Sequence, residues 1–218
     1  IAWQLRAGGS QHVYRKSTYT SKGSHMDHTG WVHIVMQWDS NNGTTADRWI
    51  VYANNVRQAQ SQYNATHQYS NSNVFSSSAY IGRAADTASN LGEFYLAEYH
   101  GISDAKLDPT HFGFTDPDTG IWRPKSPAVV KANTTYNAGS WYLDFSDSSN
   151  IGTDRSGLGN HWSANNFSAT DVVDDTPTNN FCILDNNDHG GNHAKNGNLQ
   201  SGTAGTSGWR HIRGTHIL

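Results

Sequence analysis

The polar stretch at residues 147–162, DSSNIGTDRSGLGNHW, contains residue types that bind metal ions or phosphate groups. A calcium loop of the EF-hand type needs oxygen ligands at fixed early positions and a glutamate at its end. Counted from Asp147, Ile151 falls where a ligand is needed and Leu158 where the glutamate is needed. A phosphate-binding P-loop needs a lysine beside a serine or threonine, and this stretch has no lysine. The stretch therefore matches neither type of site.

The glycines and short polar side chains of the same stretch favour two successive turns, at residues 150–152 and 156–160. Glycine supplies the positive φ angles that such turns need. The side chains of Asp147, Asp154 and Asn160 can hydrogen-bond to neighbouring backbone N–H groups and hold the turns in shape. We therefore predict that this stretch has a structural role.

The acidic residues do not have the spacing of a hydrolase site. Glycoside hydrolysis needs two carboxylates that face one cleft, which along a single strand requires an even spacing. The stretch GEFYLAEYH carries Glu93 and Glu98, whose spacing is odd, so we expect them on opposite faces of a strand. The HExxH, paired CxxC and GxSxG motifs of zinc and serine chemistry are missing from the sequence. The sequence predicts no catalytic residues and a protein that is not an enzyme.

The elements that would position a site are predicted to be short strands. Residues 31–39, WVHIVMQWD, alternate between two faces, and residues 48–52, RWIVY, form the returning strand of an antiparallel hairpin. The Asn42-Gly43 pair between them predicts a tight turn. The face of the first strand that we expect in the core consists of Val32, Ile34, Met36 and Trp38.

Further strands are predicted at residues 1–5, 79–83, 92–102 and 141–145, with one short helical turn within residues 103–112. No segment has the sustained apolar period of a long helix. We therefore predict an all-β protein built as an antiparallel two-sheet sandwich. Residues 1–145 would form the sandwich. Residues 146–218 would form a loop-rich C-terminal extension, either a connector or the start of a second β module.

Composition limits the partners of this chain. Its 218 residues carry a net charge of −3, which offers no basic surface for nucleic acid. No apolar run approaches the ~20 residues of a membrane-spanning helix, so we expect no membrane insertion. The single cysteine, Cys182, excludes an intramolecular disulfide, and its neighbours Phe181 and Ile183 predict a buried thiol.

The order of the segments WVHIVMQWD, RWIVYANNV, AYIGR and FYLAEYHGI resembles the laminin-G-like (concanavalin A-like) jelly roll over residues 31–145. This family has an Asn-Gly turn where the chain has Asn54-Asn55. The resemblance implies a jelly-roll sandwich whose N-terminal strands are incomplete, since the chain begins at Ile1 within an apparent strand.

The jelly-roll resemblance also implies a candidate metal site, because such folds often hold calcium at a loop edge. Its candidate ligands are Asp147, Asp154 and Asn160, and no other cofactor is expected. The same fold occurs in two other classes of protein, which we keep as alternatives. One is a free carbohydrate-binding lectin, and the other is a sandwich-fold glycoside hydrolase.

A second resemblance covers residues 91–215. The ordered segments TGIWRPK, WYLDFSDSSN, SGLGNHWSANNFS, DTPTNNF and GWRHIRGT are similar to those of tail-fibre and other fibrous virion proteins of tailed bacteriophages. In such proteins a further module often follows the GWR segment, so the resemblance implies a chain that is also C-terminally incomplete. It implies a structural virion protein of the particle surface that adheres to host-surface glycans or serves assembly.

The second resemblance also implies partners. Fibrous phage proteins commonly form trimers, so we expect a homo-oligomer, with a trimer favoured, that contacts other virion proteins. An open strand edge is a pairing hazard unless another segment covers it. We therefore expect the contacts between chains to involve residues 171–218 and the strand edge near residues 1–5.

Overall fold

The computed structural model describes residues 2–6, 12–16, 31–39, 41–58, 80–81, 95–167, 169–172, 174–179, 182, 184–189, 194–195, 200–201 and 212–214. The chain divides into two compact units. The first consists of Ile1–His25, His33–Leu96 and Asp104–Phe112, and the second of Met26–Val32, Ala97–Ser103 and Gly113–Leu218. The domain boundary expected between residues 145 and 146 falls within the second unit, and it stays a prediction.

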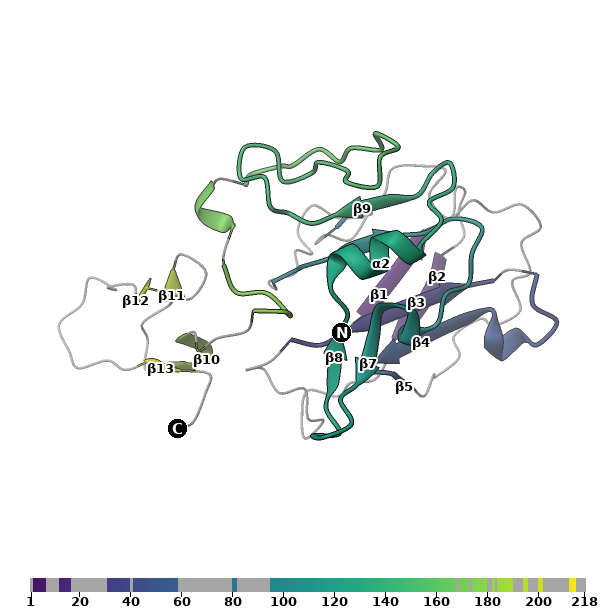
Figure 1. The fold of residues 1–218 in the computed structure, drawn as a ribbon, viewed down its shortest axis with the longest axis horizontal. Helices are drawn as coiled ribbons and strands as arrows, with labels where there is room; N and C mark the ends of the chain where they lie inside the picture. Colours follow the sequence, from purple (N-terminus) through teal and green to yellow (C-terminus); the bar gives the residue numbers. More distant parts are fainter. Residues whose placement is uncertain are drawn as a thin grey trace. The chain divides into compact units, whose positions relative to one another are not determined.

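The described residues form mostly short strands with few helices (Figure 1), and their strand pairs are antiparallel. This confirms the predicted all-β class. The strands are β1 (Ala2–Arg6), β2 (His12–Lys16), β3 (Ile34–Trp38), β4 (Trp49–Ala53), β5 (Val56–Arg57), β6 (Tyr99–Gly101), β7 (Gly113–Thr115), β8 (Trp122–Pro124), β9 (Trp141–Leu143), β10 (Leu184–His189), β11 (Ala194–Lys195), β12 (Gln200–Ser201) and β13 (Ile212–Gly214).

The strands form small sheets within the described residues. β3, β4 and β5 make a three-stranded sheet, and the remaining strands pair as β1–β2, β6–β9, β7–β8, β10–β13 and β11–β12. The helices are α1 (Pro109–Phe112) and α2 (Pro127–Asn133), with short 3-10 turns η1 (Thr45–Asp47) and η2 (Ala169–Asp171). Among the described residues, no helix is long and apolar enough to cross a membrane.

The hairpin predicted from residues 31–52 is confirmed as β3–β4, with Trp38 opposite Trp49 and their rings edge-to-face at 5.7 Å. The loop that joins the two strands is longer than the tight turn that the Asn42-Gly43 pair predicted. The backbone N–H of Asp39 donates to the Arg48 carbonyl at 2.7 Å, and η1 fills the loop between them. The predicted tight turn is wrong because this 3-10 turn, rather than the asparagine–glycine pair, reverses the chain.

The prediction of which face of β3 lies in the core is also wrong. Val35 and Gln37 are 8% and 7% exposed, whereas Ile34, Met36 and Trp38 are only partly buried. Gln37 lies on the buried face because its side-chain amide donates to the Leu107 carbonyl at 2.8 Å. That hydrogen bond removes most of the cost of burying an amide.

The turn between β4 and β5 contains Asn54 and Asn55, at φ angles of 45° and 67°. Both residues therefore adopt the left-handed conformation that a tight hairpin turn requires. Asparagine tolerates this conformation better than other residues with a side chain. The Asn54 side chain also accepts the His33 backbone N–H at 2.9 Å. The turn therefore forms without a glycine.

The strand predicted for residues 92–102 is present only as β6, and within the described residues it starts late because Glu98 has a φ angle of 52°. The strand predicted for residues 141–145 is confirmed as β9 over its first part. The strand predicted at residues 1–5 appears as β1. Of residues 79–83, Tyr80 and Ile81 are described and lie in no strand, and the others lie outside the described residues.

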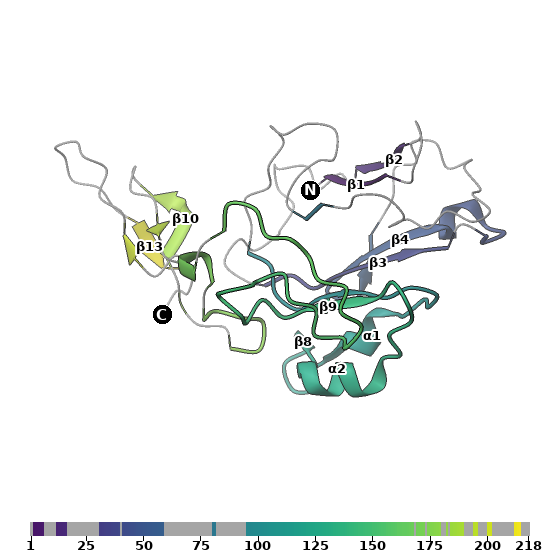
Figure 2. The same ribbon diagram turned by 90° about the horizontal axis from the view of Figure 1, so that it is seen from above.

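Helix α2 was not predicted from the sequence. Ser126 caps its N-terminus by accepting the Val129 backbone N–H, and Pro127 begins the helix. This is the usual arrangement of a capping serine followed by proline at the first helical position. The helix buries Val130 and exposes Val129, so its apolar face is narrow. Figure 2 shows the helix from above. A helix this short has no repeated apolar residues along one face, so the spacing of apolar residues in the sequence did not predict it.

The region beyond residue 165 was predicted to be mostly loop, but its described residues include β10 to β13.

Cys182 is exposed, so the prediction of a buried thiol is wrong. The reason is its position ahead of β10, which begins at Leu184, so Cys182 does not lie in a strand. The predicted α-helical turn within residues 103–112 is confirmed as α1.

Candidate functional site

The pairing of β6 with β9 forms the frame of the candidate site. His100 lies opposite Tyr142, and Gly101 lies opposite Trp141. The residues of β9 are buried, with Leu143 only 1% exposed. Gly101 is needed at its position because a Cβ atom there would lie 2.1 Å from the Trp141 ring. The glycine therefore lets the tryptophan cover the backbone of β6.

A cluster of aromatic and polar side chains lies on this frame, and we call it the Glu98 cluster: Glu98, His100, Tyr136 and Tyr142. The Tyr142 hydroxyl donates a hydrogen bond of 2.5 Å to Oε2 of Glu98. The rings of His100 and Tyr142 stack at 4.2 Å and are nearly parallel, at 3°. A hydrogen bond of 2.9 Å joins Nδ1 of His100 to the Tyr136 hydroxyl. The cluster thus ties β6 to β9 and to the segment after α2.

Burial changes the acid–base properties of the cluster. It raises the pKa of Glu98 above its ordinary value; the hydrogen bond from Tyr142 opposes the rise, and the charge of Asp144 adds to it. Burial also raises the pKa of Tyr136 to about 12, and that of Tyr142 further still, with help from Glu98. Both tyrosines therefore stay protonated at neutral pH.

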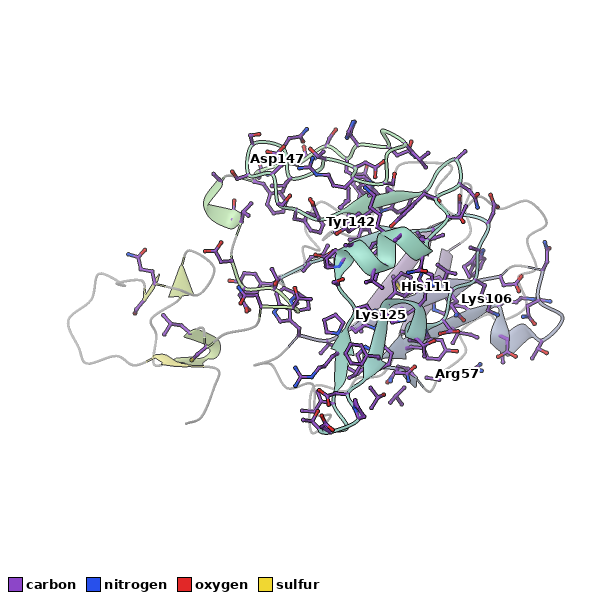
Figure 3. All side chains as sticks on the ribbon, viewed as in Figure 1. Arg57, Lys106, His111, Lys125, Tyr142 and Asp147 are labelled. Carbon is purple, nitrogen blue, oxygen red and sulfur yellow. The ribbon has the colours of Figure 1, made fainter. Side chains whose placement is uncertain are left out.

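The loop at residues 147–162 follows β9, and its first residue, Asp147, is labelled in Figure 3 together with Tyr142 of β9. The Asp154 side chain holds this loop in shape. This carboxylate is 6% exposed and accepts hydrogen bonds of 2.7–2.9 Å. The donors are the backbone N–H groups of Tyr142, Ser156 and Asn160 and the Ser156 hydroxyl. Burial alone would raise the pKa of Asp154, but these hydrogen bonds hold the pKa below its ordinary value.

The base of the same loop is closed by backbone contacts. The Trp162 N–H donates to the Gly152 carbonyl at 2.8 Å, and a Cβ atom on Gly152 would lie 1.8 Å from the Trp162 carbonyl oxygen. Trp162 also packs its ring at 5.2 Å from that of Trp141. Gly157 and Gly159, at the tip, have positive φ angles of 100° and 77°. The predicted turns, and the glycines that permit the second of them, are confirmed.

The candidate calcium ligands are only partly brought together. Asp154 accepts the Asn160 backbone N–H at 2.9 Å, while the Asn160 side-chain amide donates to the Ser140 carbonyl at 2.7 Å. Asp147 accepts from Ser149 and Asn150 and lies 4.0 Å from the Arg155 guanidinium. The described part of the chain contains no group of three or more His, Cys, Asp or Glu side chains arranged for a metal ion. The calcium site stays a prediction.

The Glu98 cluster was not predicted from the sequence, in which Glu98 was compared with Glu93. Glu93 lies outside the described residues. Asp144 is instead the acidic side chain close enough to raise the pKa of Glu98. Alternation along a strand gives no signal for Glu98, because Glu98 precedes β6 and has a φ angle of 52°. What the sequence did not indicate was that β6 pairs with β9.

A scan of protein-family models gave no family that matches this chain, and searches of curated proteins and of solved structures gave no significant match.

Proposed function

We propose that the chain is a non-enzymatic module of the virion surface of a tailed phage, in a tail fibre or another appendage. It would adhere to a host-surface glycan or serve virion assembly. We further propose that its strands belong to a laminin-G-like jelly-roll sandwich. The antiparallel all-β architecture and the resemblance of residues 91–215 to fibrous virion proteins support this proposal.

The observation that carries the proposal is the hydrogen-bonded order of the 147–162 loop. Its buried carboxylate, Asp154, is fully occupied by internal donors, so it holds the loop in shape. Residues 157–161, Gly-Leu-Gly-Asn-His, are exposed at the tip. A loop that is already ordered loses little conformational entropy when it binds a ligand.

The chemistry of the tip suits a neutral polar ligand. The Asn160 amide nitrogen donates to the Ser140 carbonyl, and Nδ1 of His161 accepts the Asp154 N–H. Each of these exposed side chains has a second polar atom for a ligand, and Leu158 offers an apolar surface that is 44% exposed. Sugar residues present hydroxyl groups beside apolar C–H faces, so a glycan matches this combination. A free lectin would use the same loop, and only the location of the protein separates it from a virion module.

A glycan array is the direct test of adhesion. The chain should bind a subset of bacterial surface glycans, and Leu158→Ala should weaken the binding at least several-fold because it removes apolar contact. Lys131→Ala, an exposed change on α2, is the matched control and should bind as the unchanged chain does. Absence of glycan binding would leave assembly as the proposed role.

The location of the protein is tested on phage particles. Mass spectrometry of purified virions should detect the chain, and antibodies against it should label an appendage of the particle in electron micrographs. A chain found only in the medium or in host cells would favour the free lectin.

A second candidate function, glycoside hydrolysis, is favoured by the carboxyl groups of Glu98 and Asp144. A carboxylic acid with a raised pKa near a second carboxylate is the usual acid–base pair of a glycosidase. Release of reducing sugar that is lost in both Glu98→Gln and Asp144→Asn, and retained in the exposed control Asp118→Asn, would establish this function and overturn the non-enzymatic proposal.

A further inference from the structure

The loop between β3 and β4 holds an Asn-Gly pair, Asn42-Gly43, that has no role in the proposed function (Figure 1). An asparagine followed by glycine is chemically labile. The glycine backbone nitrogen can attack the asparagine side-chain carbonyl, and no Cβ atom hinders its approach. Gly43 is exposed, and among the described residues nothing lies within 4 Å of a Cβ atom built on it. Water therefore reaches the reacting atoms.

The Asn42 side chain is held in one orientation from both ends of its amide. Its Oδ1 accepts the Thr44 backbone N–H at 2.9 Å, and its Nδ2 donates to Oδ2 of Asp39 at 3.3 Å. The first hydrogen bond closes a ring that contains the Gly43 nitrogen, so the carboxamide is folded back along its own backbone as in an Asx turn. The second fixes which atom is the nitrogen, because a carboxylate accepts hydrogen bonds and does not donate them.

Arg48 acts on the nucleophile of this reaction. Attack requires the Gly43 nitrogen to lose its proton, and the negative charge then spreads onto the Asn42 backbone carbonyl oxygen. Nε of Arg48 donates to that oxygen at 2.9 Å. A hydrogen bond from a guanidinium to a negatively charged oxygen is stronger than one between neutral groups. Arg48 therefore makes the Gly43 nitrogen easier to deprotonate.

The Thr44 N–H acts at the next step. When the Gly43 nitrogen bonds to Cγ of Asn42, negative charge moves to Oδ1, which is the atom that accepts the Thr44 N–H. A fixed backbone donor aimed at a developing oxyanion stabilises the transition state of acyl transfer. The loop thus presents one donor to each oxygen that becomes negative.

We propose that Asn42 is a self-modification site, at which the folded chain accelerates the conversion of this residue to aspartate or isoaspartate. The Gly43 nitrogen gives its proton to hydroxide and bonds to Cγ of Asn42. The bond from Cγ to Nδ2 then breaks, and Nδ2 leaves as ammonia after taking a proton from water. A water molecule opens the cyclic imide that remains. Breaking the new bond gives aspartate, and breaking the original peptide bond gives isoaspartate.

The product changes the loop. The donor that Asn42 offers to Asp39 becomes a carboxylate oxygen, so two like charges face each other where a hydrogen bond was. In isoaspartate the main chain also gains a carbon atom between residues 42 and 43, which displaces Thr44 from the start of η1. Modification is therefore expected to loosen the connection between β3 and β4.

Peptide mass mapping of the full chain, aged at pH 8, tests the proposal. Asn42 should be converted at least several-fold faster in the folded chain than in the same chain kept in denaturant. The readouts are the replacement of an amide by an acid and labelling of isoaspartate by a specific methyltransferase. Asn196-Gly197 is the same dipeptide and serves in denaturant as the reference for an unassisted pair. A rate at Asn42 that is equal or slower in the folded chain would overturn the proposal.

Two variants identify the groups that act. Arg48→Gln removes the guanidinium donor, so the rate should fall several-fold in the folded chain and stay unchanged in denaturant. Gly43→Ala should slow the reaction in both states, because a Cβ atom then stands beside the attacking nitrogen. Arg123→Gln, an exposed change on β8, is the matched control and should leave the rate at Asn42 unchanged.

An Arg48→Gln chain that folds and reacts as fast as the unchanged chain would show that the guanidinium does not assist, and would overturn the assigned mechanism. The comparison of folded and denatured unchanged chain decides the proposal whether or not Arg48→Gln folds. Neither measurement depends on glycan binding.

Discussion

His33 is a titratable side chain held largely out of solvent in the first unit, with the Phe112 ring at 6.0 Å. Burial lowers its pKa from 6.5 to about 4. A protonated imidazole is costly in such a position because it loses hydration. His33 therefore couples the stability of the first unit to acid.

We predict that the first unit loses stability as the pH falls below 6.5. Between 6.5 and about 4 the unfolded chain binds a proton at His33 that the folded unit does not, so the free energy of unfolding decreases through this window. The loss should not exceed about 3 kcal/mol, and solvent contact of the ring reduces it. Denaturant unfolding at pH 7 and pH 5 measures it. His33→Gln should show a smaller decrease, and an equal decrease would place the acid sensitivity elsewhere.

Gly152 is the residue that lets the base of the 147–162 loop close. A Cβ atom there would lie 1.8 Å from the backbone oxygen of Trp162, which cannot move as a flexible side chain does. Gly152→Ala should lower the free energy of unfolding by about 1–3 kcal/mol, as overpacking does. Gly43→Ala, where nothing lies within 4 Å, is the control and should change stability by less than about 0.5 kcal/mol. Denaturant midpoints compare the two, and equal effects would contradict the close contact.

At the level of elements, the two tryptophans of the β3–β4 hairpin differ in burial. Trp49 is 2% exposed, and its partner Trp38 is partly exposed. Trp49→Ala should cost about 3–5 kcal/mol, the range for removing a large buried aromatic side chain. Trp38→Ala should cost clearly less, because solvent already reaches that ring. Thermal or denaturant unfolding of both variants checks the order, and a larger cost for Trp38 would restore the original assignment of the faces.

The sequence predicted individual strands better than their surroundings. Alternation located β3, and short runs rich in aromatic and β-branched residues located β4 and β9, because both signals depend only on neighbouring residues. Alternation assigned the wrong face of β3 to the core, because the Leu107 carbonyl that accepts the hydrogen bond of the buried Gln37 amide lies far along the chain. The short helix α2 lacked a long apolar stripe, although its Ser126-Pro127 start was a local signal.

The candidate site divides in the same way. The roles of Asp147 and Asp154 as acceptors of backbone N–H groups were predicted correctly, since their donors lie mostly a few residues away. The Glu98 cluster depends on the pairing of β6 with β9, which joins residues more than forty positions apart. No local pattern contains that pairing. The hydrogen bond from the Tyr142 N–H to Asp154 was also missed, because it joins residues 12 positions apart.

For the whole molecule, we predict a homo-oligomer, with a trimer favoured. Among the described residues, β1 pairs with β2, and the sheets of the second unit are two-stranded. The edge of such a sheet is a place where a strand of another chain can pair. Light scattering with size-exclusion chromatography should give a mass of about three chains, and deletion of residues 171–218 should reduce it. A stable monomer in which residues 171–218 are ordered would contradict this prediction.

The closed base of the 147–162 loop means that its shape does not depend on the side chain at its tip. Gly152 and Trp162 are joined by a backbone hydrogen bond, and Asp154 and Asn160 bind the loop to Tyr142 and Ser140, whereas Leu158 lies exposed between Gly157 and Gly159. At the tip, nothing lies within 4 Å of a Cβ atom built on Gly157 or Gly159. Peptides could therefore be inserted between these two glycines without changing the fold. New binding specificities could evolve at the same position.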